Sequence, residues 1–336
     1  MRAITLLEPG QFGWTDLEEA TSPGPKEALV RIDTVGICGT DLHAYRGRQP
    51  FFSYPRILGH ELAVEVLAVG PEVTHLQPGD KCAVNPYLNC GTCIACRRGK
   101  TNCCIQLKVL GVHTDGGMRE RMILPADHLY PSKSLTFQQL ALIETLGIGC
   151  HAVNRSQPVS GDRALVIGAG PIGCTVMEFL RLKNIPYEVM DLNERRREFA
   201  IQNMGAVAAH HDPQSILDQT PELPTIVFDC TGNPQSMMNA FKMTSAGGKL
   251  VFVGLFIGDV SFHDPDPFHR REITLLSSRN AVPTEHAEIL RHVESGAIQT
   301  DPWIGDICPV EEMSGRFPTW TEPASQVLKA VVSWKS

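Results

Sequence analysis

The stretch that decides the fold is Ala164-Leu165-Val166-Ile167-Gly168-Ala169-Gly170-Pro171-Ile172-Gly173, which passes into a helical pattern over 176–183. A G-x-G-x-x-G sequence between a strand and a helix is typical of a turn that binds a dinucleotide. Gly168 permits the tight turn, Gly170 lets the backbone approach a pyrophosphate, and Gly173 lets helix and strand pack closely. Exposed backbone N–H groups at the N-terminus of the helix that follows favour phosphate charge, and Pro171 and Ile172 lie within the same turn. The stretch therefore predicts a dinucleotide site formed by these five residues.

An acidic residue, Asp191, ends the next predicted strand, at 187–190. An acid at this place accepts hydrogen bonds from ribose hydroxyls and repels the 2′-phosphate of NADP. The nearby Arg195, Arg196 and Arg197 keep NADP open, because arginines hold such phosphates. We interpret them as a solvated helix face, with Arg196 kept as a candidate for cofactor contact. The sequence therefore favours NAD over NADP.

Apolar strands alternate with helix-length segments from about residue 140 onward. The strands are predicted at 164–167, 187–190, 225–229, 249–254 and 273–277. Nearly all-apolar strands in such alternation predict a parallel sheet covered by helices on both faces. The fold class is therefore α/β, with a doubly wound parallel-sheet domain of the Rossmann type over residues 139–284.

A different texture marks the first part of the chain, where short strands such as 28–32 and 62–70 are broken by Gly and Pro. This punctuation predicts a compact, β-rich unit with long functional loops. Near the other end, a helix is expected at 285–295 and a last strand at 327–334, which pairs back onto the first unit. The predicted limits of the β-rich domain are 1–138 and 285–336.

Composition limits the class of protein. The 336 residues are enough for two domains, and 43% hydrophobic and 20% charged residues are the balance of a soluble globular protein. Apolar runs stay below the ~20 residues of a membrane span, and the N-terminal apolar stretch is too short for a signal peptide. A net charge of −7 gives no basic field for nucleic acid. We therefore expect a cytoplasmic protein that acts on a small polar molecule, with neither nucleic acid nor membrane as a partner.

Eleven cysteines occur in the chain, and five of them fall within residues 90–104. In a long chain without an export signal, metal binding or burial explains them better than disulfides. Four of them, Cys90, Cys93, Cys96 and Cys104, supply the four thiolates that hold a structural Zn²⁺ in a closed tetrahedron. Cys103 is the alternative to Cys104. Such a site orders its loop and does no chemistry.

Three further stretches complete the pattern: Gly36-Ile37-Cys38-Gly39-Thr40-Asp41-Leu42-His43, Leu58-Gly59-His60-Glu61 and Ile143-Glu144-Thr145-Leu146-Gly147. Taken singly, a Cys38 or a His60 is more often a buried residue than a ligand. Together with the cysteine loop and the glycine turn, the first two stretches occur in the order and spacing of the zinc-dependent medium-chain alcohol and polyol dehydrogenases. The chain resembles this family over essentially its whole length. The resemblance implies a GroES-like β-rich catalytic domain beside the Rossmann domain, with a catalytic zinc in the cleft between them and a second, structural zinc.

The resemblance also implies the ligands of the catalytic zinc. Cys38 and His60 match the firm ligands of the family. Glu61 and Glu144 match glutamates of the sorbitol- and threonine-dehydrogenase branch, which ligate directly or through water. Asp41 is expected to accept a hydrogen bond from the other ring nitrogen of His60 and to fix its tautomer, and a simple turn residue is the alternative.

The reaction that the resemblance implies is the oxidation of a secondary alcohol. Zinc lowers the pKa of the substrate hydroxyl, and a hydride passes to the nicotinamide. Thr40 and His43 resemble the family's proton relay, and a histidine with a pKa near 6.5 suits this work. A capped turn and a surface histidine are the alternatives, and Glu144 is a second candidate for the proton acceptor. The family forms dimers and tetramers, so a homodimer or homotetramer is expected.

Two loops, over 49–56 and 111–117, resemble a narrower branch: bacterial enzymes that oxidise C5 of L-galactonate or L-gulonate in hexuronate catabolism. The stretch 277–281 matches the same branch. A sugar acid carries a carboxylate, which needs a cation or several N–H donors in the pocket. The candidates are Arg48, Arg56, His113 and, toward either cofactor or substrate, Arg279.

Other functions stay open at this stage. A sorbitol-type polyol, a polyol phosphate or L-threonine suits the same metal residues. A zinc-free, quinone-reductase-like NADPH-binding protein typically lacks the metal residues that this chain has. A zinc-finger nucleic-acid binder disagrees with the negative net charge. For the cluster of His210, His211 and Asp212 the alternatives are an adventitious metal site and a solvated loop, and we interpret it as a solvated loop.

Overall fold

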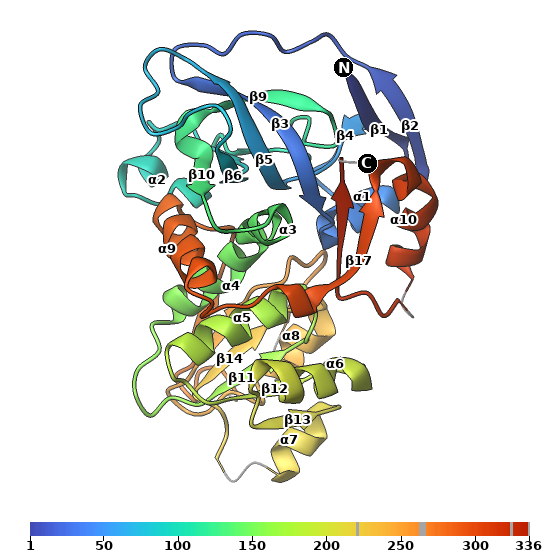
Figure 1. Ribbon diagram of the computed structural model, residues 1–336. Helices are drawn as coiled ribbons and strands as arrows, with labels where there is room; N and C mark the ends of the chain where they lie inside the picture. The colour runs from blue at the N-terminus through green and yellow to red at the C-terminus, as the bar shows by residue number, and fades with distance from the viewer. Residues whose placement is uncertain (220–221, 262–266, 323–324, 335–336) are drawn as a thin grey trace. The chain divides into compact units, whose positions relative to one another are not determined.

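A computed structural model of the chain describes residues 1–219, 222–261, 267–322 and 325–334 (Figure 1). The chain divides into two compact units, Met1–Glu144 with Val282–Ser336, and Thr145–Ala281. The sequence places these limits at 138/139 and 284/285, and the domain limits stay a prediction. Residues 323–324 and 335–336 of the predicted first domain lie outside the described residues.

The first unit is built of β-sheets. Its strands are β1 (Arg2–Glu8), β2 (Gln11–Asp16), β3 (Glu27–Gly36), β4 (Arg56–Ile57), β5 (Glu61–Val69), β6 (Lys81–Val84), β7 (Tyr87–Leu88), β8 (Lys108–Val109), β9 (Arg121–Pro125), β10 (Leu129–Ser132), β17 (Ile304–Pro309) and β18 (Lys329–Ser333). The largest sheet has the order β10-β6-β5-β3-β18-β17, with β9 paired to β3, and smaller sheets are β2-β1-β4 and β7-β8. Because β18 pairs antiparallel with β3, the predicted return of the last strand to the first unit is confirmed.

Short helices connect these strands. They are α1 (Gly39–Tyr45), α2 (Ile94–Arg97), α3 (Phe137–Ala141), α9 (Pro283–Glu294) and α10 (Met313–Thr321). The helix predicted over 285–295 is α9, which starts two residues earlier because a proline suits the first helical turn. A longer helix, α4 (Ile143–Ser156), begins at the last two residues of the first unit and continues in the second.

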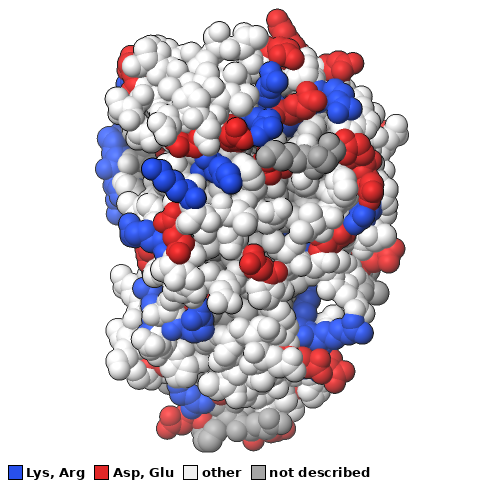
Figure 2. Space-filling view, viewed as in Figure 1, with Lys and Arg blue, Asp and Glu red and all other residues white. Residues whose placement is uncertain are grey.

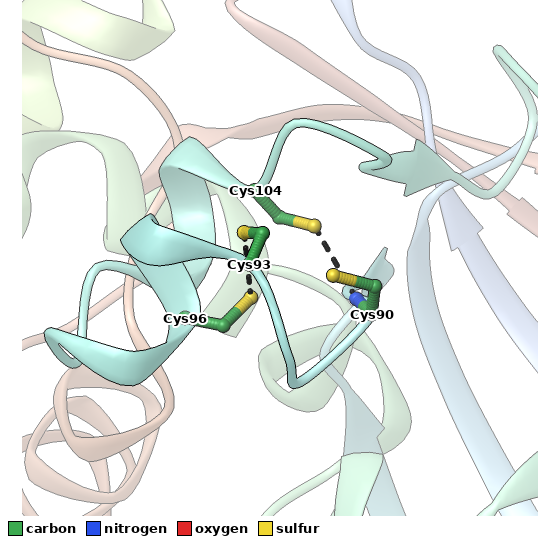
Figure 3. Close-up of side chains that lie close together, drawn as sticks. All are labelled: Cys90, Cys93, Cys96 and Cys104. Carbon is green, nitrogen blue, oxygen red and sulfur yellow. Dashed lines mark hydrogen bonds between the residues drawn. The ribbon is translucent and has the colours of Figure 1, made fainter.

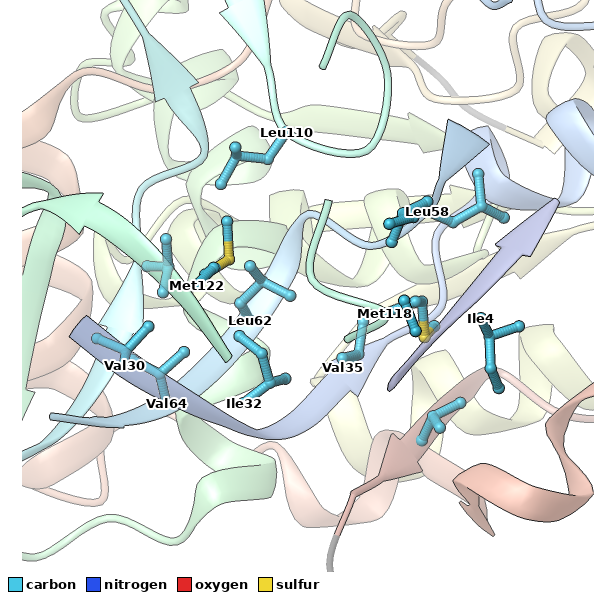
Figure 4. Close-up of a cluster of buried hydrophobic side chains, with 14 of the residues drawn as sticks. Ile4, Val30, Ile32, Val35, Leu58, Leu62, Val64, Leu110, Met118 and Met122 are labelled. Atoms are coloured by element: carbon cyan, nitrogen blue, oxygen red, sulfur yellow. The ribbon is translucent and has the colours of Figure 1, made fainter. Parts of the chain in front are cut away.

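Buried side chains of neighbouring strands form the core of the first unit (Figure 4). Val30, Ile32 and Val35 of β3, with Leu62 and Val64 of β5, are each at most 1% exposed. Branched side chains fit the pleated surface of a sheet, and full burial of each contributes ~1.5–3 kcal/mol. The core therefore holds β3 and β5 firmly, and the ends of these strands carry the residues of the site described below.

The second unit contains one parallel sheet. Its strands are β11 (Ala164–Ile167), β12 (Tyr187–Met190), β13 (Ala208–His210), β14 (Ile226–Asp229), β15 (Lys249–Phe252) and β16 (Thr274–Ser277), and its further helices are α5 (Pro171–Leu182), α6 (Glu194–Phe199), α7 (Pro213–Gln219) and α8 (Pro234–Ala240). The strand order is β13-β12-β11-β14-β15-β16, with every neighbouring pair parallel. Counted from the first strand, this is the 3-2-1-4-5-6 order of a doubly wound dinucleotide-binding sheet. The predicted Rossmann class is confirmed.

The glycine turn joins β11 to α5. Gly168 has a φ of +91°, which glycine adopts without the strain of a side chain. A Cβ on Gly173 would lie 1.8 Å from the carbonyl oxygen of Gly168, so only glycine permits this approach of helix to strand. The helix begins at Pro171, earlier than the predicted 176, because a proline is pre-organised for a first helical turn.

Charges of both signs are interspersed on the face of the molecule in Figure 2. This distribution agrees with the net charge of −7, which offers no broad basic field. Among the described helices, none combines the length and the apolar character needed to cross a membrane.

One local prediction is wrong. His210 does not belong to a solvated loop, because it ends β13 and is 4% exposed. Its Nε2 lies 2.7 Å from Oε2 of Glu188, whose Oε1 accepts a hydrogen bond from Arg163 at 3.0 Å. The exposed His211 fits the prediction. A strand of three residues is too short for its alternation to be read from sequence.

Candidate metal centres and dinucleotide site

Four cysteines converge in one loop of the first unit (Figure 3). The sulfur atoms of Cys90, Cys93, Cys96 and Cys104 all lie within 4.8 Å of one another. Cys93 is the residue before α2, so this single turn of helix brings the sulfurs of Cys93 and Cys96 to 3.5 Å. Cys103 is exposed and outside the group, so the structure favours Cys104 as the fourth thiol.

Backbone N–H groups stabilise thiolate charge in this loop. Hydrogen bonds from the backbone of Thr92 and Cys93 lower the pKa of Cys90 to about 6. Cys104 Sγ accepts from the N–H groups of Cys90 and Gln106, at 3.3 Å each. Desolvation instead raises the pKa of Cys96 to about 12. Four converging sulfurs within 4.8 Å of one another are the donor set of a structural zinc.

A second cluster forms where β3 ends, β5 begins and α1 starts. Cys38 Sγ, a ring nitrogen of His60 and a carboxylate oxygen of Glu61 lie within 4.8 Å of one another. The Cys38 N–H donates to Oδ2 of Asp41 at 2.9 Å, which fixes the start of α1. Glu61 stands directly opposite Gly36 in the pairing of β3 with β5. Strand pairing and a helix cap therefore bring together residues that are far apart in the chain.

Asp41 approaches His60 closely. Its Oδ1 lies 3.8 Å from Nδ1 of His60, and in the described part of the chain neither atom has a hydrogen-bond partner. Burial lowers the pKa of His60, but the charges of Asp41 and Cys38 outweigh it and raise this pKa well above its usual value. Burial raises the pKa of Asp41. The expected contact of Asp41 with the His60 ring exists as a close approach, longer than a hydrogen bond.

Glu144, in the first turn of α4, lies near this cluster but outside the group of ligand atoms within 4.8 Å. Its charge contributes to the raised pKa of His60. The Tyr87 hydroxyl donates to Oε1 of Glu144, and both side chains are at most 5% exposed. Burial raises the pKa of Glu144 and of Tyr87. Sequence reasoning did not predict this contact, since the two residues belong to different elements.

Lys329, the first residue of β18, completes the surroundings of Glu61. Its side chain is 2% exposed, and its ammonium lies against both carboxylate oxygens of Glu61. Burial lowers the pKa of Lys329, but the charges of Glu61 and Cys38 outweigh it and raise this pKa. Sequence reasoning missed this residue. The available signal was a single cation within the apolar stretch Leu328-Lys329-Ala330-Val331-Val332.

The donors of both clusters fit zinc. Thiolate, imidazole and carboxylate are its usual ligands, and a four-sulfur set is that of a structural site. At the second cluster, Cys38, His60 and Glu61 offer one donor of each of these three types within 4.8 Å of one another. This donor set fits a catalytic zinc, since thiolate, imidazole and carboxylate all bind this ion.

The relay candidates Thr40 and His43 lie one helical turn apart on α1. Thr40 is partly buried and His43 is exposed. Desolvation, followed by the charges of Arg46 and Arg48, lowers the pKa of His43. This residue therefore has the position of a proton exchanger with solvent, and its role stays a prediction.

The substrate candidates differ in what they contact. Arg56 donates to Ser53 Oγ at 2.8 Å and forms an ion pair with Asp115 at 3.3 Å, so its charge is already compensated. His113 Nδ1 accepts from the Val109 N–H at 3.1 Å, and its ring stacks on Phe51. Arg48 is exposed at the end of α1. Arg279 belongs to the second unit.

The carboxylate of Asp191 is fixed beside the glycine turn. Its Oδ2 accepts from the Ala169 N–H at 2.7 Å and its Oδ1 from the Asn193 N–H at 2.8 Å. Arg197 donates to the carbonyl oxygen of Asp191 at 2.7 Å, so it is not the fully solvated residue that the sequence suggested. Arg196 is half-buried, and its guanidinium is 3.6 Å from the place of a Cβ on Gly170.

Comparison with known proteins shows the family of this chain. Residues 24–134 match the model of the alcohol dehydrogenase GroES-like domain, and residues 171–295 match that of the zinc-binding dehydrogenases. L-galactonate-5-dehydrogenase of Escherichia coli (strain K12) is 36% identical over 99% of both chains. The chain belongs to the zinc-type alcohol dehydrogenases. It is therefore an NAD(P)-dependent oxidoreductase, and the predicted family, enzyme class and GroES-like domain are confirmed.

Two further relatives indicate the branch of the family to which this zinc-type dehydrogenase belongs. D-altritol 5-dehydrogenase of Agrobacterium fabrum (strain C58 / ATCC 33970) is 35% identical over 83% of this chain and 84% of its own. The crystal structure of the RspB alcohol dehydrogenase from E. coli CFT073, complexed with NADH, has a TM-score of 0.92 at 27% identity and covers 99% of both chains. The enzyme belongs among the zinc-type polyol and sugar dehydrogenases, which act on small molecules.

Proposed function

We propose that this enzyme uses NAD to oxidise the C5 hydroxyl of a sugar acid, L-galactonate or L-gulonate. The observation that carries the proposal is the 36% identity with L-galactonate-5-dehydrogenase over 99% of both chains. The loops 49–56 and 111–117 resemble the same branch. The D-altritol dehydrogenase relative supports a second candidate, the oxidation of a neutral polyol.

Cys38 and His60, with Glu61 or Glu144, would hold the catalytic zinc, and the four-cysteine loop would hold the structural one. Bound at the first site, zinc supplies a Lewis acid that favours the ionised form of a substrate hydroxyl. Asp41 keeps the His60 ring in place from the side of Nδ1, at 3.8 Å. Tyr87 holds the Glu144 carboxylate through its hydroxyl. Two of the zinc donors, His60 and Glu144, are therefore held by partner residues before any substrate binds.

Thr40 and His43 would carry the hydroxyl proton away. Thr40 lies two residues from Cys38, and His43 lies one turn further along α1 with access to solvent. Desolvation and the nearby arginines favour the neutral imidazole of His43, which is the form that accepts a proton. A relay from a partly buried hydroxyl to an exposed imidazole follows from this spacing.

The cofactor would bind at the glycine turn, where NAD supplies the hydride acceptor. Its pyrophosphate would lie on Gly168, Gly170 and Gly173 at the start of α5, next to Pro171 and Ile172. The Asp191 carboxylate is held by two backbone N–H groups beside this turn. A fixed negative charge there repels a 2′-phosphate, which supports NAD over NADP. Arg196, within reach of the turn, is the residue that would accommodate NADP instead.

Arg48 is the best candidate for binding a substrate carboxylate. Its guanidinium is exposed and its charge reaches His43, which ties it to the relay helix α1. Arg56 is less suited, because Asp115 already compensates its charge. His113 offers a ring packed on Phe51 and a nitrogen that already accepts a hydrogen bond. Arg279 stays a candidate for a contact with the cofactor.

The test is the rate of NADH formation with L-galactonate, L-gulonate, D-altritol, sorbitol and L-threonine, with NAD and NADP in parallel. We expect the highest kcat/KM for a sugar acid with NAD. In the Arg48→Ala variant, KM for the sugar acid should rise while the rate with a neutral polyol stays unchanged. The exposed Arg195→Ala variant is the matched control. A higher kcat/KM for D-altritol than for either sugar acid would establish the polyol function instead.

A further inference from the structure

Three neighbouring strands build the surroundings of Glu61. In the order β5-β3-β18, Gly36 of β3 stands opposite Glu61 on one side and Val331 on the other. A Cβ on Gly36 would lie 2.1 Å from Glu61 Oε2, so the missing side chain makes the space that this carboxylate fills. Lys329 is two residues before Val331 and lies on the same face of the sheet. It therefore reaches across Gly36 to Glu61.

Lys329 is also unusual in its burial. Among the described residues, it is the one lysine or arginine that is buried. Its ammonium lies against both oxygens of a carboxylate that is itself 0% exposed. A buried cation of this kind persists only where its partner is fixed, because removing either member leaves an uncompensated charge. The position of Glu61 is thus set by charge as well as by space.

We propose that Lys329 is a positioning residue that shares the Glu61 carboxylate with the catalytic metal and keeps this carboxylate from becoming a permanent ligand. The inference rests on the proposed metal site at Cys38 and His60. Lys329 competes with a divalent cation for the same oxygens, and it repels that cation. Both effects weaken the hold of the site on its metal. They also keep one coordination position available to a substrate oxygen, as a catalytic zinc site requires.

The proposal predicts that Lys329→Met slows the release of the metal and does not speed it. Without the ammonium, Glu61 is a free buried carboxylate beside the metal, so the metal should be held more tightly. We expect zinc release from the holoenzyme to a chromogenic chelator to slow by about tenfold for the Cys38 site. At the same time kcat should fall, with little change in KM. A merely structural lysine predicts the opposite, that is, unchanged or faster release from a loosened fold.

Two variants provide the controls. Lys329→Arg keeps the cation, and release at the wild-type rate would support the proposal. Lys249→Met removes another lysine at the first position of a strand, whose ammonium donates to the carbonyl oxygens of Ser156 and Gln157 at 2.6 and 3.0 Å. It should leave zinc release unchanged. If Lys249→Met slows release as much as Lys329→Met does, the proposal is wrong.

A second comparison avoids the unpaired carboxylate of Lys329→Met and remains informative if that variant fails to fold. Glu61→Gln leaves Lys329 charged beside the metal, and Glu61→Gln/Lys329→Gln leaves no charge at either position. Zinc should leave the single variant faster than the double variant. Equal release rates would overturn the proposal. The absorption of the Co²⁺-substituted proteins gives a second readout, since a change of carboxylate ligation alters the spectrum of the single-thiolate site.

The zinc content separates this inference from the proposed function. If Cys38→Ser does not lower the zinc content of the protein, the catalytic site itself has been assigned wrongly. If Cys38→Ser removes one zinc while Lys329→Met leaves release unchanged, only the role of Lys329 is wrong.

Discussion

The two candidate metal centres of the first unit are built in opposite ways. The cysteine centre is local, because its four sulfurs come from residues 90–104 and one helical turn. The centre at Cys38 and His60 is assembled from two strand ends and a helix start, with Lys329 added from β18. The first contains one type of ligand. The second contains a thiol, an imidazole and carboxylates, each with its own partner.

This difference shows how structure and reactivity are divided between the centres. Ile94 and Ile105, beside the cysteines, are 58% and 76% exposed, so the cysteine loop has little hydrophobic packing to order it. A bound metal would supply that order. Around Cys38 the order comes from the core of the sheet, so a metal bound there would be free to serve chemistry. Variants of each centre test whether order and reactivity are divided in this way.

The largest effect is expected for Cys38→Ser. This change removes a ligand of the proposed catalytic zinc, and activity should fall by more than the ~100-fold that loss of an outer partner costs. The zinc content should fall by one per chain. Thermal unfolding should change little, because the surrounding sheet does not depend on the metal. The exposed Cys103→Ser is the control, and it should keep both zinc ions and full activity.

Cys96→Ser should have the reverse profile. With three thiols left, the loop loses its zinc and its order, since four ligands close the structural site. Limited proteolysis should cut within 90–104 in this variant and not in the wild type. Activity per folded molecule should remain, and its loss before any cleavage would contradict the division between the two centres.

A pH effect on stability is expected from His286, whose ring lies 6.1 Å from that of Tyr87 between centroids. Burial lowers its pKa from 6.5 to about 4, while the Val282 carbonyl and Glu285 raise it and His128 lowers it further. The unfolded chain binds the proton more tightly, so the stabilisation is complete above pH 6.5 and is lost as pH falls from 6.5 toward 4. The lowered pKa of His286 corresponds to about 3 kcal/mol of folding free energy between the two ends of this pH range.

The measurement is denaturant unfolding between pH 7.5 and 4 for the wild type and His286→Phe. An aromatic ring without a titrating nitrogen keeps the stacking on Tyr130, whose ring centroid lies 5.4 Å away. The variant should lose less stability on acidification. Identical pH curves for the two proteins would exclude His286 as the source.

The smallest effect is expected for Gly36→Ala. The new methyl group would meet Glu61 Oε2, and overpacking of this kind costs ~1–3 kcal/mol. In the Glu61→Ala background the cost of Gly36→Ala should be smaller than in the wild type, because the clashing carboxylate is gone. A double-mutant cycle on the unfolding free energy measures this coupling. Additive effects would show that Gly36 and Glu61 do not share the space described above.

The sequence predicts what is local or periodic. The glycine turn, the apolar strands 164–167 and 187–190 and the cysteine spacing each lie within a short segment, so their geometry follows from chain connectivity. The resemblance adds Cys38, His60 and Glu61, which the structure brings together. The assignments of Thr40, His43, Glu144 and the substrate arginines remain predictions.

The sequence does not predict which residues contact the buried carboxylates of Glu61 and Glu144. Tyr87 and Glu144 are 57 residues apart, and Glu61 and Lys329 are 268 residues apart. A charged residue in an apolar strand indicates a buried partner without indicating which one. Similarly, His210 looks like a solvated residue until its pairing with Glu188 is known.

The long separation of Glu61 and Lys329 has a consequence for biosynthesis. During translation, Cys38, His60 and Glu61 leave the ribosome long before Lys329, whereas the four cysteines of 90–104 emerge almost together. The cysteine loop can therefore take up its metal on the nascent chain. The surroundings of Glu61 are complete only after β18 has inserted beside β3, a closure of 268 residues with a correspondingly large entropic cost. Until then Glu61 meets incoming cations without its ammonium counter-charge, so a metal that binds there early would be held more tightly than in the finished fold.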